Sequence, residues 1–294
     1  MTATAAREAT FAAERDRLVG VAYRMTGSRA EAEDVVQDAW LRWQRADTDE
    51  VACPAAWLTT VTSRLALDRL TSARSRREAY VGPWLPEPVA TDPDPAERAE
   101  LAESLSLGFL AVLERLGPVE RVVFLLADVF SVPFDEIARV VDRSPAACRQ
   151  VASRARRRVR QDRPRFHPTD AEARRVTEAF LGAVAVGDVE GVTALLAPDV
   201  VCVSDGGPDH RAARRPVRGP ERVCRLLVNL TRRLPAADAS ITARDLNGQP
   251  GVVVEAEGRT LLALACSVVD GVVDRVWIVV NPEKTAALQG PPAP

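Results

Sequence analysis

The chain of 294 residues has little of several residue types on which common protein classes depend. It contains two histidines, two tyrosines and five cysteines, and no two cysteines stand in a Cys-x-x-Cys pair. A structural zinc site needs four cysteine or histidine ligands close together, so we expect no metal site. We also expect no cofactor. The odd number of widely spaced cysteines and the lack of a signal peptide predict free thiols and a cytoplasmic protein.

Long apolar runs are also missing. No stretch of 18 apolar residues exists, so the sequence predicts no membrane span and no membrane partner. Lysine is nearly absent, since Lys284 is the single lysine among 39 basic residues. The 41 acidic residues bring the formal net charge to −2, which taken alone argues against a nucleic-acid partner. The net charge averages over the whole chain, however. Whether the chain binds nucleic acid therefore depends on how its charges are distributed locally.

Prolines mark the expected domain boundaries. Residues 80–97 contain five of the 21 prolines and cannot form a helix or a central strand. We therefore predict a linker over residues 80–96 between two domains, residues 1–79 and 97–162. A second proline-containing boundary, residues 161–169, precedes a third domain at residues 170–289.

The first two domains are expected to be all-α. Apolar spacing predicts a helix over Thr10–Met25 with Thr10 as its N-cap, ended by Gly27, and Ser28 can cap the next helix. A third helix begins at Pro54, and another is expected over Ala96–Arg115.

The third domain has the pattern of an α+β fold. Helices are followed by β-branched runs, which are separated by turn signals at Asn247-Gly248, Gly258 and Asp270-Gly271. This order predicts a small cone in which helices cap a curled antiparallel sheet.

The densest functional signal lies in the second domain. A short helix at Phe134–Val141, a turn at Asp142–Arg143 and a second helix capped by Ser144 form the layout of a helix-turn-helix. Eight arginines stand against one acid between Cys148 and Arg165. The DNA-facing side of the second helix is predicted to carry Ser144, Ala146, Arg149, Gln150, Ser153, Arg156, Arg157 and Arg160.

Two further helix faces carry charge. The helix from Pro54 has a basic side suited to single-stranded or melted DNA, although Trp57 also fits a core position. The residues concerned are Trp57, Arg64, Arg69, Arg74, Arg76 and Arg77. The preceding helix has an acidic face with one leucine, which fits protein docking or ordinary solvation, opposite a core face of Val36, Trp40 and Trp43. That acidic face consists of Asp34, Gln37, Asp38 and Leu41.

These segments together resemble the extracytoplasmic-function sigma factors of bacteria. AEDVVQDAWLRW is similar to the helix of the family that binds core RNA polymerase. PAAWLTTVTSRLALDRLTSARSRRE is similar to its −10 recognition and melting helix, and residues 116–159 to its −35 helix-turn-helix. The resemblance implies promoter-specific initiation, with core polymerase and promoter DNA as partners. It also implies recognition of flipped bases by the loop at residues 47–54.

The linker and the third domain resemble one subgroup, in which a SnoaL-like domain is fused to the sigma domains and regulates them in cis. The resemblance rests on YVGPWLPEP, on SDGG and on NPEK. It implies regulatory roles for Trp84, Leu85, Asp205, Gly206, Gly207, Asn281, Pro282 and Lys284. Pro208, Asp209, Glu283 and Thr285 depart from the subgroup's pattern.

Regulation could proceed through packing of the third domain against the other two, by way of Trp84 and Leu85, with or without an unknown small ligand. Two other functions remain open. One is a one-component helix-turn-helix regulator that senses a ligand and needs no polymerase. The other is a SnoaL-like cyclase or isomerase, with Asp205, Asp209 or His210 as base. Catalysis is disfavoured because both tyrosines, Tyr23 and Tyr80, lie outside the third domain and no oxyanion donor is evident.

Overall fold

The computed structural model describes residues 3–47, 51–78, 80–91, 104–162, 171–208, 210, 212–234 and 239–288. The chain divides into two units. Unit 1 combines residues 1–78 with 112–162, and unit 2 combines residues 79–111 with 163–294. The two sigma-like helical segments thus belong to one unit, and the proline-rich segment groups with the third domain.

Unit 1 begins with three long helices, α1 (Ala3–Thr26), α2 (Arg29–Arg45) and α3 (Pro54–Glu78). Gly27 ends α1 at a φ of 72°, and the Ser28 hydroxyl accepts a hydrogen bond from the Glu31 amide, as expected. The predicted N-cap at Thr10 is wrong. Its hydroxyl donates to the Ala6 carbonyl inside α1, because the alanine-rich residues before it continue the helix.

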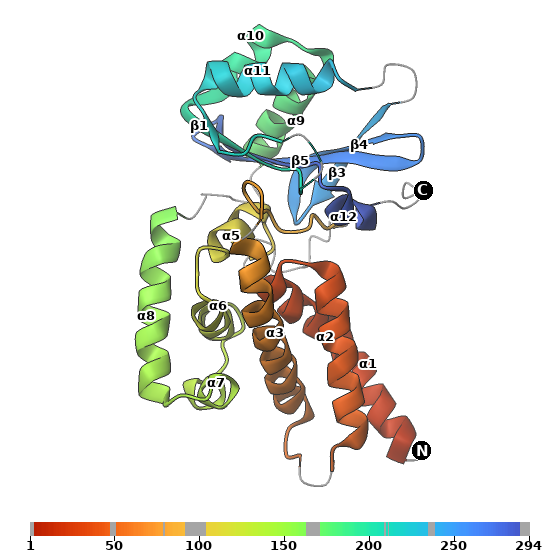
Figure 1. Ribbon diagram of the computed structural model, residues 1–294, viewed down its shortest axis with the longest axis vertical. Coiled ribbons are helices and arrows are strands. Elements are labelled where there is room, and N and C mark those ends of the chain that lie inside the picture. Colours follow the sequence, from red (N-terminus) through yellow and green to blue (C-terminus); the bar gives the residue numbers. More distant parts are fainter. Residues whose placement is uncertain are drawn as a thin grey trace. The chain divides into compact units, whose positions relative to one another are not determined.

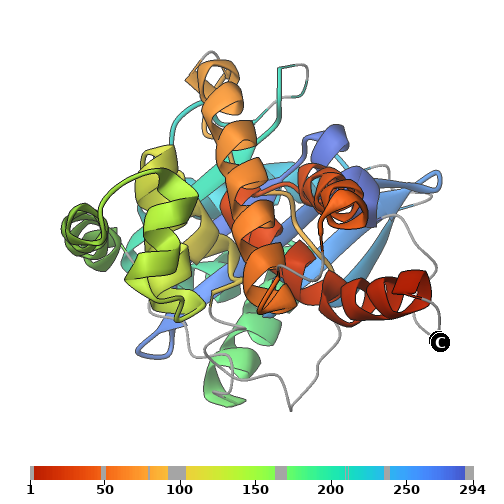
Figure 2. The ribbon, with the colours of Figure 1, turned by 90° about the horizontal axis from the view of Figure 1, so that it is seen from below.

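The second half of unit 1 contains the helix-turn-helix. Its elements are α6 (Pro118–Phe124), the π-helix η2 (Leu125–Val129), α7 (Phe134–Val141) and α8 (Pro145–Asp162). They follow α5 (Leu107–Leu113), most of which belongs to unit 2. Helix α5 begins later than the expected Ala96, after a turn at Ser104–Leu105, because the Ser106 hydroxyl caps the Phe109 amide. Residues 92–103 lie outside the described part of the chain. Figures 1 and 2 show α3 between α1 and α2 on one side and α6 and α7 on the other.

Unit 2 places three helices on one face of a six-stranded sheet (Figure 1). The helices are α9 (Ala171–Val186), α10 (Val189–Ala194) and α11 (Pro220–Thr231). The strands are β1 (Leu196–Asp205), β2 (Val217–Arg218), β3 (Ser240–Leu246), β4 (Gln249–Ala256), β5 (Arg259–Val269) and β6 (Val272–Val279). The chain then forms α12 (Pro282–Thr285) and the 3₁₀-helix η3 (Ala286–Leu288).

The strand order is β2-β1-β6-β5-β4-β3, and β1 runs parallel to β6. This pair departs from the antiparallel sheet expected from the sequence. Tight turns join β3 to β4, β4 to β5 and β5 to β6, so each of these strands runs opposite to the one before it. Strand β1 is separated from β6 by a long stretch of chain that contains α11, which allows the two strands to run parallel. The predicted turns are present, with positive φ at Asn247, Gly248, Asp270 and Gly271, as type I′ hairpins require.

Candidate functional site

The outer face of α8 presents its predicted DNA-binding residues to solvent. Ser144 caps the helix by accepting from the Ala147 amide at 3.2 Å. The exposed residues are Ala146, Arg149, Gln150, Ser153, Arg157 and Arg160. Arg156 differs, because it is half-buried and forms a 2.7 Å ion pair with Asp128. The charged and polar side chains on this exposed face are suited to reading bases and neutralising phosphates.

The opposite face of α8 holds it on its scaffold. Cys148, Val151, Ala155 and Val159 are buried, as the helical spacing predicted. Burial raises the pKa of the Cys148 thiol, which keeps it in its neutral form inside the core. The Arg149 guanidinium lies 5.5 Å from the centre of the Phe134 ring on α7, so the first helix of the motif supports a side chain of the second.

The predicted −10 residues on α3 have diverse surroundings. Trp57 pairs with the ring of Trp43 at 5.3 Å between centroids and is partly buried, which fits its alternative role in packing. Arg64 donates two hydrogen bonds to the Arg139 carbonyl near the end of α7. Arg69 lies close to two acidic residues of α2. The side chains of Arg74, Arg76 and Arg77 fall outside the described residues, as do residues 48–50 of the loop predicted to hold flipped bases.

The acidic face of α2 is open to solvent, apart from these contacts. Asp34, Gln37 and Leu41 are exposed, with Leu41 44% accessible, and Asp38 is half-buried. Asp34 and Asp38 lie 3.8 and 3.6 Å from the Arg69 guanidinium. Of the predicted core face, Val36 and Trp43 are buried, whereas Trp40 is half-buried and packs against the Phe11 ring.

One buried arginine joins the two halves of unit 1. Arg121 on α6 is 3% exposed and pairs with Glu114. Its guanidinium also donates to the carbonyl of Leu113 at 3.1 Å and to that of Met25, at the end of α1, at 2.8 Å. Arg121 was not predicted as a functional residue, because nothing local distinguishes it from an exposed helical arginine.

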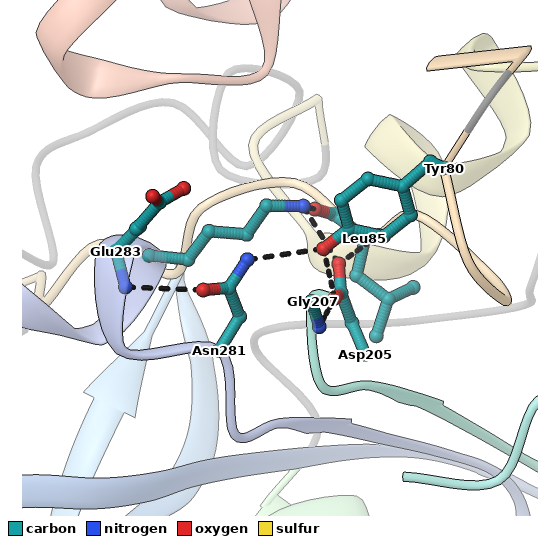
Figure 3. Close-up of polar contacts among 7 residues, drawn as sticks. Tyr80, Leu85, Asp205, Gly207, Asn281 and Glu283 are labelled. Carbon is teal, nitrogen blue, oxygen red and sulfur yellow. Dashed lines mark hydrogen bonds and ion pairs between the residues drawn. The ribbon is translucent and has the colours of Figure 1, made fainter. Parts of the chain in front are cut away.

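A second constellation lies entirely within unit 2 and is called here the linker clamp: Tyr80, Trp84, Leu85, Asp205, Gly207, Asn281 and Lys284. Figure 3 shows its polar contacts, without Trp84 and with the neighbouring Glu283. It joins the proline-rich segment to the end of β1 and to the start of α12. The structure thus brings together Tyr80 and Asn281, which are 201 positions apart. Four of the six residues that the subgroup resemblance singled out in the third domain meet here.

Asp205 is the centre of the clamp and is fully buried. Its Oδ1 accepts from the Tyr80 hydroxyl at 2.5 Å and from the Gly207 amide at 3.0 Å. Its Oδ2 accepts from the Leu85 amide at 2.8 Å and from the Lys284 ammonium at 2.6 Å. These donors, one of them a cation, offset the cost of burying this carboxylate.

Lys284, the single lysine of the chain, satisfies three groups at once. Besides Asp205, its ammonium donates to the Leu85 carbonyl at 2.6 Å and lies 3.8 Å from the centre of the Trp84 ring. The ammonium therefore joins the Asp205 side chain of the third domain to the backbone of the linker. A cation over an indole face adds a favourable electrostatic contact.

Gly207 allows close packing between the loop after β1 and the start of α12. Gly207 has a φ of 67°, and a Cβ there would lie 2.9 Å from the Asn281 side chain. Asn281 caps α12 through the Glu283 amide and donates to the Tyr80 hydroxyl at 3.0 Å. The neighbouring Pro282 takes the first helical position of α12, where its missing N–H costs nothing.

The linker continues across the sheet face that α9 to α11 leave open. Leu85 is 1% exposed and packs with Leu107, Ala265 and Trp277. Farther along, Val89 exchanges hydrogen bonds with Asn247, using the Asn247 side chain and amide. Contacts with the third domain thus fix the position of this segment.

Tyr80 was not predicted as a site residue. It lies outside the third domain in the sequence, and its contact with Asp205 spans 125 positions. Burial and the hydrogen bond to Asp205 raise its pKa strongly, so the phenol stays neutral and keeps donating. Its place as the first residue of the YVGPWLPEP segment was the one available signal.

The interior of the cone offers little for catalysis. A cavity of about 30 Å³ lies between α9, α11 and the sheet, and its described lining is apolar except for Thr231. The buried thiols of Cys202 and Cys266 have pKa values raised to about 12 by desolvation, which fits their predicted core role. Across the described residues no helix is long and apolar enough to cross a membrane. The same residues include no cluster suited to a metal ion.

Comparisons with known proteins agree with these features. The family model for Sigma-70 region 2 matches residues 10–76, and that for Sigma-70, region 4 matches residues 106–159. The chain is 42% identical over 287 residues to the ECF RNA polymerase sigma factor SigJ of Mycobacterium tuberculosis, covering 93% of this chain and 91% of that protein. It is 35% identical over 277 residues to the probable ECF RNA polymerase sigma factor SigI of the same species, covering 93% of each.

A solved structure extends this likeness to the full fold. The crystal structure of the M. tuberculosis extracytoplasmic function sigma factor SigJ matches with a TM-score of 0.75 at 40% identity, covering 94% of this chain and 96% of that one. The two helical regions, the helix-turn-helix and the C-terminal sheet domain therefore share one framework with a known sigma factor. The chain belongs to the extracytoplasmic-function sigma factors of RNA polymerase, in the group that carries a SnoaL-like C-terminal domain.

Proposed function

We propose that α8 contacts the −35 element, that α3 contacts and opens the −10 element, and that the acidic face of α2 docks on core RNA polymerase. The exposed basic face of α8 carries this proposal. Arg157 and Arg160 form no ion pair with any residue that the structure describes, so their charges remain available for phosphates. A factor with this role works in the cytoplasm, beside polymerase and DNA.

A run-off assay with purified core polymerase tests this function. We expect a promoter-dependent transcript when the intact chain is added, and none with core polymerase alone. The opposite pattern is specific DNA binding by the chain alone with no transcript. That pattern would favour the one-component regulator.

We further propose that the linker clamp modulates initiation in cis. Residues 79–111 connect the two helical halves of unit 1, and the clamp binds residues 80–85 to the third domain. Within unit 1, Arg64 of α3 is occupied by the Arg139 carbonyl and Arg121 of α6 by the Met25 carbonyl. Promoter contact by Arg64 requires that the first of these contacts open. A linker held by the third domain restricts that opening, so release of the clamp should favour the open state.

Lys284→Met tests the regulatory role in the intact chain. It removes the ammonium that joins Asp205 to the linker and lies far from the predicted DNA and polymerase faces in sequence. We expect more transcript per bound polymerase than with the unmodified chain. A bias of about 1.4 kcal/mol would change the competent population tenfold when that population is small. Unchanged output, with the linker shown to be released, would contradict the proposal. Arg259→Met, at an exposed position of β5, serves as control.

A further inference from the structure

A pocket of about 400 Å³ lies next to the linker clamp, within unit 2. Val81 and Pro83 of the linker line one part of it, and described residues between Ser204 and Arg214 line another part. The volume falls in the range of about 300–1,000 Å³ that is typical of small-molecule sites. It is separate from the small apolar cavity of the cone, with which it shares no lining residue among those described.

The inner wall of this pocket is preorganised. A Cβ at Gly206 would lie 2.5 Å from the His210 carbonyl oxygen and 2.8 Å from the Ala212 Cβ, so the loop folds back tightly over a residue without a side chain. The Ala213 amide donates to the Ser204 hydroxyl at 2.9 Å and fixes the return of the loop. Both oxygens of Asp205 accept hydrogen bonds within the clamp, one of them from the Lys284 ammonium, and Asp205 is not among the described lining residues.

The ionisable side chains among the described lining residues are basic. Among the described lining residues, the ionisable side chains are those of His210 and Arg214, and both are exposed. Neither forms a hydrogen bond or an ion pair through its side chain with any described residue. The Arg214 cation and the His210 imidazole line a pocket that also has apolar walls from Val81, Pro83 and Pro208. Such a site attracts a negatively charged group and accommodates an apolar body beside it.

We propose that this pocket binds a small organic anion, a carboxylate or a phosphate ester, with Arg214 as its main cationic contact. Because the pocket has walls from both the linker and the loop, a bound anion touches both and stabilises the docked linker. This second step rests on the regulatory role proposed above. Binding itself does not.

Calorimetric titration of the intact chain tests the site with three probes that share a ring: phenyl phosphate, benzoate and neutral benzyl alcohol. We expect at least one anion to bind with a Kd of about 1 mM or tighter, and benzyl alcohol to bind at least tenfold more weakly. The preferred anion then shows whether the site takes phosphates or carboxylates. Equal binding of all three probes, or no binding by either anion up to about 10 mM, would overturn the proposal.

Matched variants locate the binding. Arg214→Gln should raise the Kd of the anion about tenfold, since the substitution removes a charge-assisted contact. Arg215→Gln is the control, because Arg215 is the exposed neighbour outside the described lining and should change the Kd less than about twofold. Equal effects of the two variants would rule out this pocket. Unchanged thermal unfolding of both variants shows that the fold is intact.

The effect on the linker has its own measurement. Hydrogen exchange at the Leu85 amide, which donates to Asp205, should slow when the pocket is filled with the anion that binds. Anion binding without slower exchange at Leu85 would contradict the proposed stabilisation of the linker, whereas the proposed binding site would stand. A failure of the regulatory role would appear only in the transcription assay, so the two failures are distinguishable.

Discussion

The DNA-facing side of α8 and the linker clamp use basic residues in opposite ways. On α8, Arg149, Arg157 and Arg160 are exposed. In the clamp, the Lys284 side chain is 11% exposed and is bonded to a carboxylate that is fully buried. The first arrangement leaves charge available for a partner, and the second neutralises it within the fold. The planar guanidinium suits phosphates and base edges, whereas the compact ammonium binds a carboxylate, a carbonyl and an indole face together.

The largest expected effect comes from breaking the buried pair. Lys284→Met leaves Asp205 buried without its cation, and the free energy of unfolding of unit 2 should fall by about 3–5 kcal/mol. Denaturant titration measures this change. The control is Arg29→Met, which removes an exposed i,i+4 pair with Glu33 and should cost about 0.3–0.5 kcal/mol. Similar losses in the two variants would show that burial gives the clamp no special strength.

Tyr80→Phe tests the neutral part of the clamp. It removes a hydrogen bond to a charged acceptor, which should cost about 1.5–3 kcal/mol of unfolding free energy. It should also change the pH dependence. The pKa of Tyr80 is raised above its usual value of 10.0, so the unfolded chain loses this proton first as pH rises.

The contribution of Tyr80 to stability is thus complete below its usual pKa of 10.0 and declines as the pH rises above it. Denaturant titrations of both proteins across this pH range measure the decline. The Tyr80→Phe variant should lack it, because phenylalanine carries no titratable proton. Parallel stability curves for the two proteins would contradict this account.

On α8, the residues near the helix start are expected to read bases. Arg149→Ala and Gln150→Ala should each cost about 1–3 kcal/mol of binding at particular −35 positions. Binding of the reconstituted polymerase complex to a set of promoters with single-base changes measures this. A uniform loss on every sequence would assign these side chains to the phosphate backbone.

The smallest effect is expected farther along α8. Arg157→Ala should weaken all promoters similarly and lower the slope of log K against log salt by about one. Arg158→Ala is the matched control, because its guanidinium already pairs with Glu120 at 2.6 Å. A salt slope reduced equally by both substitutions would show that the intramolecular pair does not withhold Arg158 from DNA.

Much of unit 1 was predictable because its signals are local. The bounds of α7 and the cap at Ser144 follow from residues within one or two turns, as do the buried faces of α2 and α8. The same holds for the hairpin turns of unit 2, which depend on adjacent residues such as Asn247 and Gly248. Thr10 failed as a cap because the alanine-rich residues before it are equally compatible with helix.

The clamp was only partly predictable. The resemblance to a sigma subgroup singled out Asp205 and Lys284 but did not show that they form an ion pair. Tyr80 and Arg121 were missed, since their partners lie 125 and 96 positions away, respectively. The pairing of β1 with β6 likewise depends on a contact across the length of the third domain.

The sequence by itself determined the helices, the turn chemistry, the basic face of α8 and the family, because each depends on residue type and short spacing. Only the tertiary structure decided that the proline-rich segment is bound to the third domain and that the single lysine is neutralised there. The physical reason is burial. A carboxylate removed from water must find its donors wherever the fold brings them, and the spacing along the chain does not reveal which ones those are.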